Sequence, residues 1–142
     1  MREKQYRKSE RGFTLVELLF VVVILGLLAS LALPNLFRQG QKARAGIAKS
    51  QIATLGTALD TYALDTGRYP ATEEGLEALI SAPAGESMWD GPYLKKAVPK
   101  DPWGNDYVYS SGGTSGAYEI ICYGADGRQG GEADSGDISS ND

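Results

Sequence analysis

The stretch SERGFTLVELLFVVVILGLLASLALP, residues 9–34, decides the architecture of this chain. A hydrophobic run begins at Phe13, directly after Gly12, and continues to Pro34. A helix needs about 20 apolar residues to cross a bilayer, so this run is long enough to span one. The sequence therefore predicts a membrane helix with the rest of the chain carried on its C-terminal side.

One carboxylate, that of Glu17, lies inside the hydrophobic run. A helix that begins at Phe13 rises about 1.5 Å per residue, which places Glu17 about 6 Å in, where water can still solvate it. The alternative is a functional role, because an unpartnered charge inside a membrane helix costs about 2.5 kcal/mol or more. Cleavage after Gly12 would give Phe13 a positive α-amino group. We favour an ion pair between Glu17 and such an amine, in the same chain or in a neighbouring one.

The formal net charge of −4 is unevenly distributed. Residues 1–12 hold five basic and two acidic side chains, a net charge of +3, which leaves about −7 for the remainder. Basic residues that precede a membrane segment stay on the cytoplasmic side, so the C-terminal part is expected to cross the membrane. Its acidic character argues against nucleic acid as a partner, since such binding depends on neutralising phosphates.

The chain has a single cysteine, Cys122, and no histidine. This composition excludes an intramolecular disulfide and a zinc site built from paired thiols or imidazoles. We interpret Cys122 as a buried small residue. No nucleophile–base pair and no phosphate-binding loop stands out, so we expect a protein that is not an enzyme.

Residues 13–65 are predicted to form one long helix, which Pro34 would kink or locally melt. The second half of this helix has an apolar face that must cover another element, and a small sheet of the same chain is the obvious candidate. The fold class is therefore α+β: a long N-terminal helix, with a transmembrane half and an amphipathic half, packed on a small antiparallel β-sheet. The residues of the apolar face are Ala45, Ala48, Ile52, Leu55, Leu59 and Tyr62.

The remaining elements follow from local signals. Gly67 is expected to end the long helix, and Thr72 to cap a short helix through about Ser81 with acidic residues in its first turn. A loop rich in proline and glycine covers residues 82–104. Residues 106–110 and 117–123 read as two strands of a hairpin. We interpret Asp101 and Asp106 as turn caps, and Trp89 and Trp103 as packing residues.

The segment 124–139, which we call the acidic loop, combines carboxylates with glycines. Such a segment can wrap a hard cation, because Ca2+ takes 6–8 oxygen ligands from carboxylates and carbonyls. The spacing is not that of an EF-hand. A disordered acidic terminus is the alternative, and the residues by themselves favour it.

The motif GFTLVE, residues 12–17, with the apolar run after it, resembles the class III signal of type IV pilins and pseudopilins. The resemblance implies that a prepilin peptidase cuts between Gly12 and Phe13 and methylates Phe13. It also implies that Glu17 neutralises the Phe13 amine of an adjacent subunit during assembly. The expected organisation is a leader peptide (1–12), a transmembrane and assembly helix (13–34) and a periplasmic domain (35–142).

The C-terminal part is similar to the major pseudopilins of type II secretion systems, on the segments TGRYP (66–70), TEEGL (72–76), DPWG (101–104) and GADG (124–127). This similarity implies a type IV pilin-like fold and one Ca2+ in the acidic loop. Carried over residue by residue, the implied ligands are side chains of Asp126, Asp134 and Asp137 and the carbonyls of Tyr123 and Ser139. The ligands near the C-terminus are the least well matched, because the segment after Ile138 departs from the family's pattern.

The resemblance also implies a role. The chain would be the major subunit of a pseudopilus that polymerises in the periplasm and drives export of folded proteins across the outer membrane. Its implied partners are further copies of itself, minor pseudopilins, the prepilin peptidase, the assembly platform of the inner membrane, and the inner membrane itself, which it would cross once.

Two other readings stay open at this point. The chain could be a type IV pilin of a surface fibre, although type IVa pilins usually carry a disulfide-closed loop that a chain with one cysteine cannot form. It could also be a membrane-anchored calcium-binding module that never polymerises. An anchored enzyme is a third class, and no catalytic constellation supports it.

Overall fold

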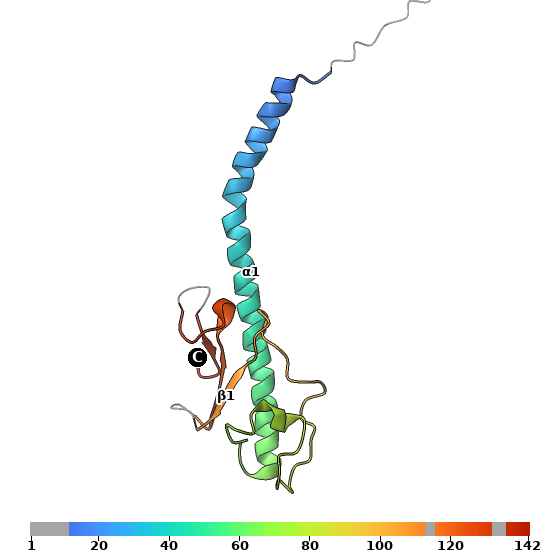
Figure 1. Cartoon of the computed structure of the whole chain (residues 1–142), viewed down its shortest axis with the longest axis vertical. Coiled ribbons are helices and arrows are strands. Elements are labelled where there is room, and N and C mark those ends of the chain that lie inside the picture. Colours follow the sequence, from blue (N-terminus) through green and yellow to red (C-terminus); the bar gives the residue numbers. More distant parts are fainter. Residues whose placement is uncertain (1–11, 113–115, 132–135) are drawn as a thin grey trace, which may run out of the picture. The chain divides into compact units, whose positions relative to one another are not determined.

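The computed structural model describes residues 12–112, 116–131 and 136–142, and its longest element is helix α1, Leu15–Thr66 (Figure 1). This confirms the predicted long helix. The N–H of Gly67 donates to the Ala63 carbonyl at 2.9 Å, and Gly67 has φ +78°, so glycine ends the helix as expected. Of the two effects predicted at Pro34, a kink or local melting, the melting is wrong, because the helical backbone continues through it, and the kink stays a prediction. One missing donor leaves the hydrogen bonds of the flanking residues in place.

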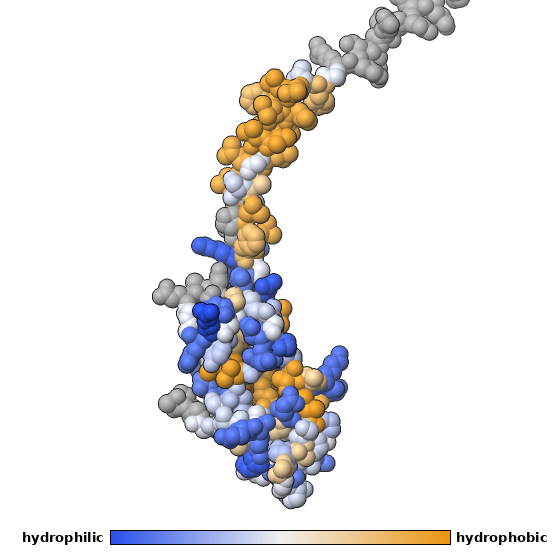
Figure 2. Space-filling view, in the orientation of Figure 1, coloured by the Kyte–Doolittle hydropathy of each residue, from blue (hydrophilic) through white to orange (hydrophobic). Residues whose placement is uncertain are grey.

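The chain divides into two compact units, and the boundary falls between Phe37 and Arg38. Within the first unit, the large apolar side chains from Phe13 to Leu33 have exposed fractions between 46% and 81%. Figure 2 shows this part of α1 as an almost continuous hydrophobic surface. Its length and composition are sufficient to cross a membrane.

The second unit contains a three-stranded antiparallel sheet in the order β1-β2-β3. Strand β1, Val108–Ser111, pairs with β2, Tyr118–Cys122, as the predicted hairpin. Strand β3, Ile138–Ser139, adds to the other edge of β2, with Cys122 opposite Ile138. The sequence did not predict β3, because two residues are too few to show an alternating pattern.

The core of the second unit lies between α1 and the sheet, as predicted. The apolar face of α1 is buried from Ala48 to Tyr62, and Ala45 packs at its edge. The residues that the sheet and the segments around it contribute to the same cluster are Tyr107, Tyr109, Ile120, Cys122 and Ile138. Burial of large apolar side chains contributes about 1.5–3 kcal/mol each, so this contact holds the sheet on the helix.

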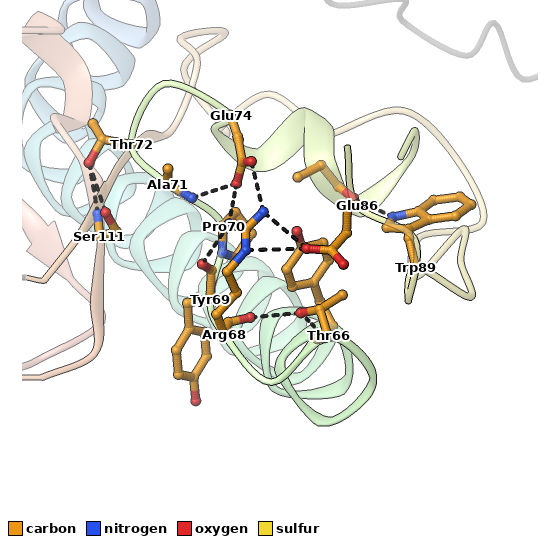
Figure 3. A network of polar contacts seen from close by, with 12 residues as sticks. Thr66, Arg68, Tyr69, Pro70, Ala71, Thr72, Glu74, Glu86, Trp89 and Ser111 are labelled. Carbon is orange, nitrogen blue, oxygen red and sulfur yellow. Dashed lines mark hydrogen bonds and ion pairs between the residues drawn. The ribbon is translucent and has the colours of Figure 1, made fainter. Parts of the chain in front are cut away.

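The short helix predicted from Thr72 to Ser81 is wrong in its start and its cap (Figure 3). Only a four-residue 3-10 helix, η1, Leu76–Leu79, forms, and it begins after Gly75, whose φ of +60° is not helical. The Thr72 hydroxyl instead accepts the Ser111 N–H at 3.0 Å and so connects this segment to β1. The carboxylate of Glu74 accepts the Ala71 N–H and pairs with Arg68, both at 2.7 Å.

The predicted loop 82–104 contains no helix or strand. Its aromatic residues pack against the core, as expected for Trp89 and Trp103. The indole of Trp89 donates to the Ala78 carbonyl at 2.8 Å, and the indole of Trp103 donates to the Gln41 side chain at 3.0 Å. These two bonds attach the loop to η1 and to α1.

Candidate functional site

The first candidate site is the start of α1, where Gly12, Phe13 and Glu17 follow one another on an exposed segment. Glu17 lies in the first helical turn, where a negative charge interacts favourably with the helix dipole. Phe13 is 80% exposed. The structure thus places the proposed cleavage point, the residue that would carry the new amine, and the carboxylate within about one turn of each other.

Sequence reasoning missed the part that Thr14 plays at this site. Its hydroxyl accepts the Glu17 N–H at 3.2 Å, and its carbonyl accepts the Leu18 N–H at 3.1 Å, so Thr14 caps the helix. The signal was present, because Thr14 and Glu17 have the T-x-x-E spacing of a capping box. This cap fixes the first turn through the backbone N–H of Glu17. The helix start therefore does not depend on the charge of the Glu17 side chain.

The second candidate site is the acidic loop, which starts with the 3-10 helix η2, Gly124–Asp126. The exposed Asp126 side chain accepts the Arg128 N–H at 3.2 Å. Asp137 returns to this segment and accepts the Gly130 N–H through Oδ2 at 2.8 Å. Ser139 lies in β3 opposite Ile121. Asp134 lies outside the described residues.

One atom of the acidic loop bears directly on the calcium prediction. Oδ1 of Asp137 is buried, and among the described residues no hydrogen-bond donor reaches it. A buried unsatisfied carboxylate oxygen is costly, and a cation at this point would satisfy it. The residues present therefore fit a bound Ca2+, although the described residues do not bring three or more carboxylate or thiol groups together. The ligand set stays a prediction.

A buried carboxylate lies at the base of the acidic loop. Asp101 is 4% exposed, and its Oδ1 accepts the N–H groups of Trp103 at 3.0 Å and Asn105 at 2.8 Å. This confirms Asp101 as a turn cap. Asp106 is not one: its exposed carboxylate instead pairs with Lys100 at 2.9 Å.

Cys122 is fully buried at the end of β2, which confirms its interpretation as a core residue. Its thiol donates to Oδ2 of Asp101 at 3.2 Å. Burial, together with the Asp101 carboxylate, raises the pKa of Cys122 to about 11. The thiolate is the reactive form of cysteine, so Cys122 is expected to be unreactive. Its role is structural, because its thiol donates to Asp101 in the turn 101–105.

Comparison with known proteins bears on the N-terminal motif and the C-terminal unit separately. Residues 7–33 match the family model of the prokaryotic N-terminal methylation motif. Residues 35–141 match the family model "Type II secretion system (T2SS), protein G". One match thus covers the apolar N-terminal segment, and the other covers almost all of the chain that follows it.

Individual relatives agree with the family models. The type II secretion system core protein G of Pseudomonas aeruginosa is 45% identical over 139 residues, covering 94% of this chain and 96% of that protein. The core protein G of Vibrio cholerae is 46% identical over 140 residues, covering 96% and 94%.

A solved structure supports the fold. The crystal structure of the major pseudopilin from the type 2 secretion system of enterohaemorrhagic Escherichia coli is 37% identical, with a TM-score of 0.64, and the match covers 75% of this chain and 94% of that one. This likeness confirms the expected pilin-like α+β fold. The chain belongs to the type II secretion system protein G family, the family of the major pseudopilins.

Proposed function

We propose that this pseudopilin polymerises in the periplasm into the pseudopilus, and that the filament drives folded proteins across the outer membrane. The observation that carries this proposal is the exposed apolar surface of the first unit together with the capped Glu17. Apolar surface contributes about 25 cal/mol per Å2 when it leaves water. Two environments would bury the apolar surface of the first unit. The precursor would bury it in the inner membrane, and the assembled subunit would bury it against neighbouring copies.

The charges at the helix start favour assembly over a permanent anchor. Removal of the leader would leave one positive amine, on Phe13, and one carboxylate, on Glu17, at the edge of the apolar segment. Each charge is costly in a lipid-like filament core unless the two neutralise each other. Pairing between adjacent copies satisfies both and selects one axial register. The proposed partners are further copies, minor pseudopilins, the prepilin peptidase and the assembly platform of the inner membrane.

Processing supplies the first test. Mass spectrometry of the protein from its natural host should show a chain that begins with methylated Phe13. A Gly12→Val variant should keep its leader and fail to form filaments, because the peptidase reads the small residue before the cut. Among the described residues, a side chain at position 12 would meet nothing within 4 Å, so a folding defect would not explain the result.

The control is Gly26→Ala, which also adds a side chain where the described residues leave open space. It should be processed like the wild type. An intact leader on the wild-type protein in a host with a working peptidase would contradict the proposal.

We also propose that the acidic loop binds one Ca2+. The residues that would hold it are Asp126, Asp134 and Asp137, with carbonyl oxygens of Tyr123 and Ser139. The support is the turn that presents Asp126 and the buried Oδ1 of Asp137, which no hydrogen-bond donor of the described residues reaches. The ion would supply positive charge to these oxygens, and the proposed role is structural, with no catalytic step.

A chelator should therefore lower the melting temperature of the full chain in detergent. A ligand that binds only the folded state stabilises it by RT ln(1 + [L]/Kd), about 2.7 kcal/mol at a hundredfold excess over Kd. The difference between calcium and chelator should vanish in Asp126→Ala. The matched control is Asp106→Ala, which removes an exposed carboxylate elsewhere and should respond to calcium like the wild type. Equal wild-type melting curves in calcium and chelator would rule out the site.

A further inference from the structure

We propose that Asn105 is a positioning residue for the acidic loop: it holds η2, and with it Tyr123 and Asp126, in the geometry that binds the cation. This inference rests on the proposed calcium binding and concerns a residue outside the proposed ligand set. Asn105 lies in the turn 101–105, about twenty residues earlier in the chain than the segment it would position.

The backbone of Asn105 is fixed on both sides. Its N–H donates to Oδ1 of Asp101, and its carbonyl accepts the Asp101 N–H, both at 2.8 Å. Asp101 is itself buried and accepts the Cys122 thiol at 3.2 Å. The turn is thereby attached to the end of β2, the strand that leads into the acidic loop. Contacts outside the acidic loop therefore fix the backbone from which the Asn105 side chain extends.

The side chain of Asn105 bonds the first residue of η2 and lies beside its C-cap, Gly127. Its Nδ2 donates to the Gly124 carbonyl at 3.2 Å. At the other end, a Cβ on Gly127 would lie 3.2–3.4 Å from three atoms of the Asn105 side chain. Gly127 also has φ +64°, a conformation that favours glycine. Asn105 therefore holds the start of η2 by a hydrogen bond, and at the C-cap of η2 its side chain leaves little room for any residue larger than glycine.

The same turn also reaches the second ligand segment. Trp103 lines a surface pocket together with Asp137 and Ile138. The turn 101–105 thus contacts the segment of Asp126 through Asn105 and borders the segment of Asp137 through Trp103. Groups that orient metal ligands commonly matter for affinity by about 10–100-fold when removed. Asn105 is such a group, because it lies outside the proposed ligand set and bonds the start of the segment that carries Asp126.

The test is the Ca2+ dissociation constant of the full chain in detergent, measured by titration calorimetry with calcium chloride. Asn105→Ala should raise this constant by about 10-fold or more. Asn105→Asp separates two causes, because it preserves shape, adds a negative charge and removes the Nδ2 donor. Simple attraction predicts tighter binding for Asn105→Asp, whereas loss of positioning predicts weaker binding. We expect weaker binding.

Glycine substitutions test the packing contact. Gly127→Ala should weaken Ca2+ binding, and Gly112→Ala is its matched control, since Gly112 has a similar φ of +70° and open space among the described residues. Combining Gly127→Ala with Asn105→Ala removes the three atoms that the new Cβ would meet. The double variant should therefore bind Ca2+ more tightly than the sum of the two single effects predicts.

A purely structural contact is represented by Thr72→Ala. The Thr72 hydroxyl accepts the Ser111 N–H at 3.0 Å, and among the described residues it has no hydrogen bond to η2 or to the turn 101–105. This variant should melt earlier by the same amount in calcium and in chelator, with an unchanged dissociation constant. The Asn105 variants should instead lose more stability in calcium than in chelator.

The outcomes separate this inference from the proposal beneath it. If the wild type binds no Ca2+, the proposed calcium site fails, and this inference fails with it. If the wild type binds Ca2+ and Asp126→Ala does not, but both Asn105 variants bind like the wild type, only the positioning role is overturned.

Discussion

Glu17→Gln should abolish the cross-linked oligomer ladder of the processed protein in intact membranes. Glutamine retains the size of the side chain and the backbone N–H that donates to the Thr14 hydroxyl, so the helix start is preserved and only the charge is lost. The neighbour's amine would then enter the apolar interface unneutralised. At about 2.5 kcal/mol per contact, the association constant should fall by roughly 70-fold at each step.

Asp106→Ala is the control for this experiment. It removes an exposed carboxylate of the second unit, which lies outside the apolar segment proposed to assemble. Its loss should leave the ladder unchanged. A wild-type ladder from Glu17→Gln would contradict the amine–carboxylate contact and favour a membrane-anchored module that does not polymerise through it.

Asp101→Ala should cause a large loss of stability in the second unit. It would leave the buried N–H groups of Trp103 and Asn105 and the Cys122 thiol without their acceptor. Hydrogen bonds to charged groups contribute about 1.5–3 kcal/mol each. We expect a loss of about 3 kcal/mol or more, which corresponds to a fall of about 10 °C or more in melting temperature.

The measurement is thermal unfolding of the full chain in detergent with a chelator present, so that calcium plays no part. Asp101→Asn should lose less, because its remaining oxygen can still accept both N–H groups. Asp106→Ala is the matched control: it removes an exposed carboxylate paired with Lys100, and such pairs contribute about 0–1 kcal/mol. A melting temperature for Asp101→Ala within a degree or two of the wild type would show that this buried cap is dispensable.

The sequence was sufficient to predict an element of structure wherever that element depends on adjacent residues or on a periodic pattern of residues. The first half of α1 follows from a long apolar run that only Glu17 and Ser30 interrupt with polar side chains after Thr14, and the apolar face of the second half follows from its spacing. The hairpin follows from alternation on both sides of a glycine-rich link. Each of these signals lies within one segment, so it can be read without knowing what the segment packs against.

Sequence reasoning failed where a partner far along the chain decides the outcome. Thr72 has the local features of a helix cap, yet its hydroxyl accepts the N–H of Ser111 on β1. Glu74 suits a first helical turn, yet Arg68 and the Ala71 N–H hold its carboxylate. Strand β3 is two residues long and exists only because β2 offers a free edge.

The sequence by itself determined that this protein has the motif GFTLVE, an apolar helix with one carboxylate that is long enough to cross a membrane, and an acidic loop rich in possible calcium ligands. Each is a property of adjacent residues: hydrophobic length, charge and composition. Only the tertiary structure decided that Asp101, Asn105 and Cys122 form the base of that loop, and that one oxygen of Asp137 is buried without a donor among the described residues. Those facts depend on which atoms from distant parts of the chain approach within about 3.2 Å, the range in which N–H···O hydrogen bonds form.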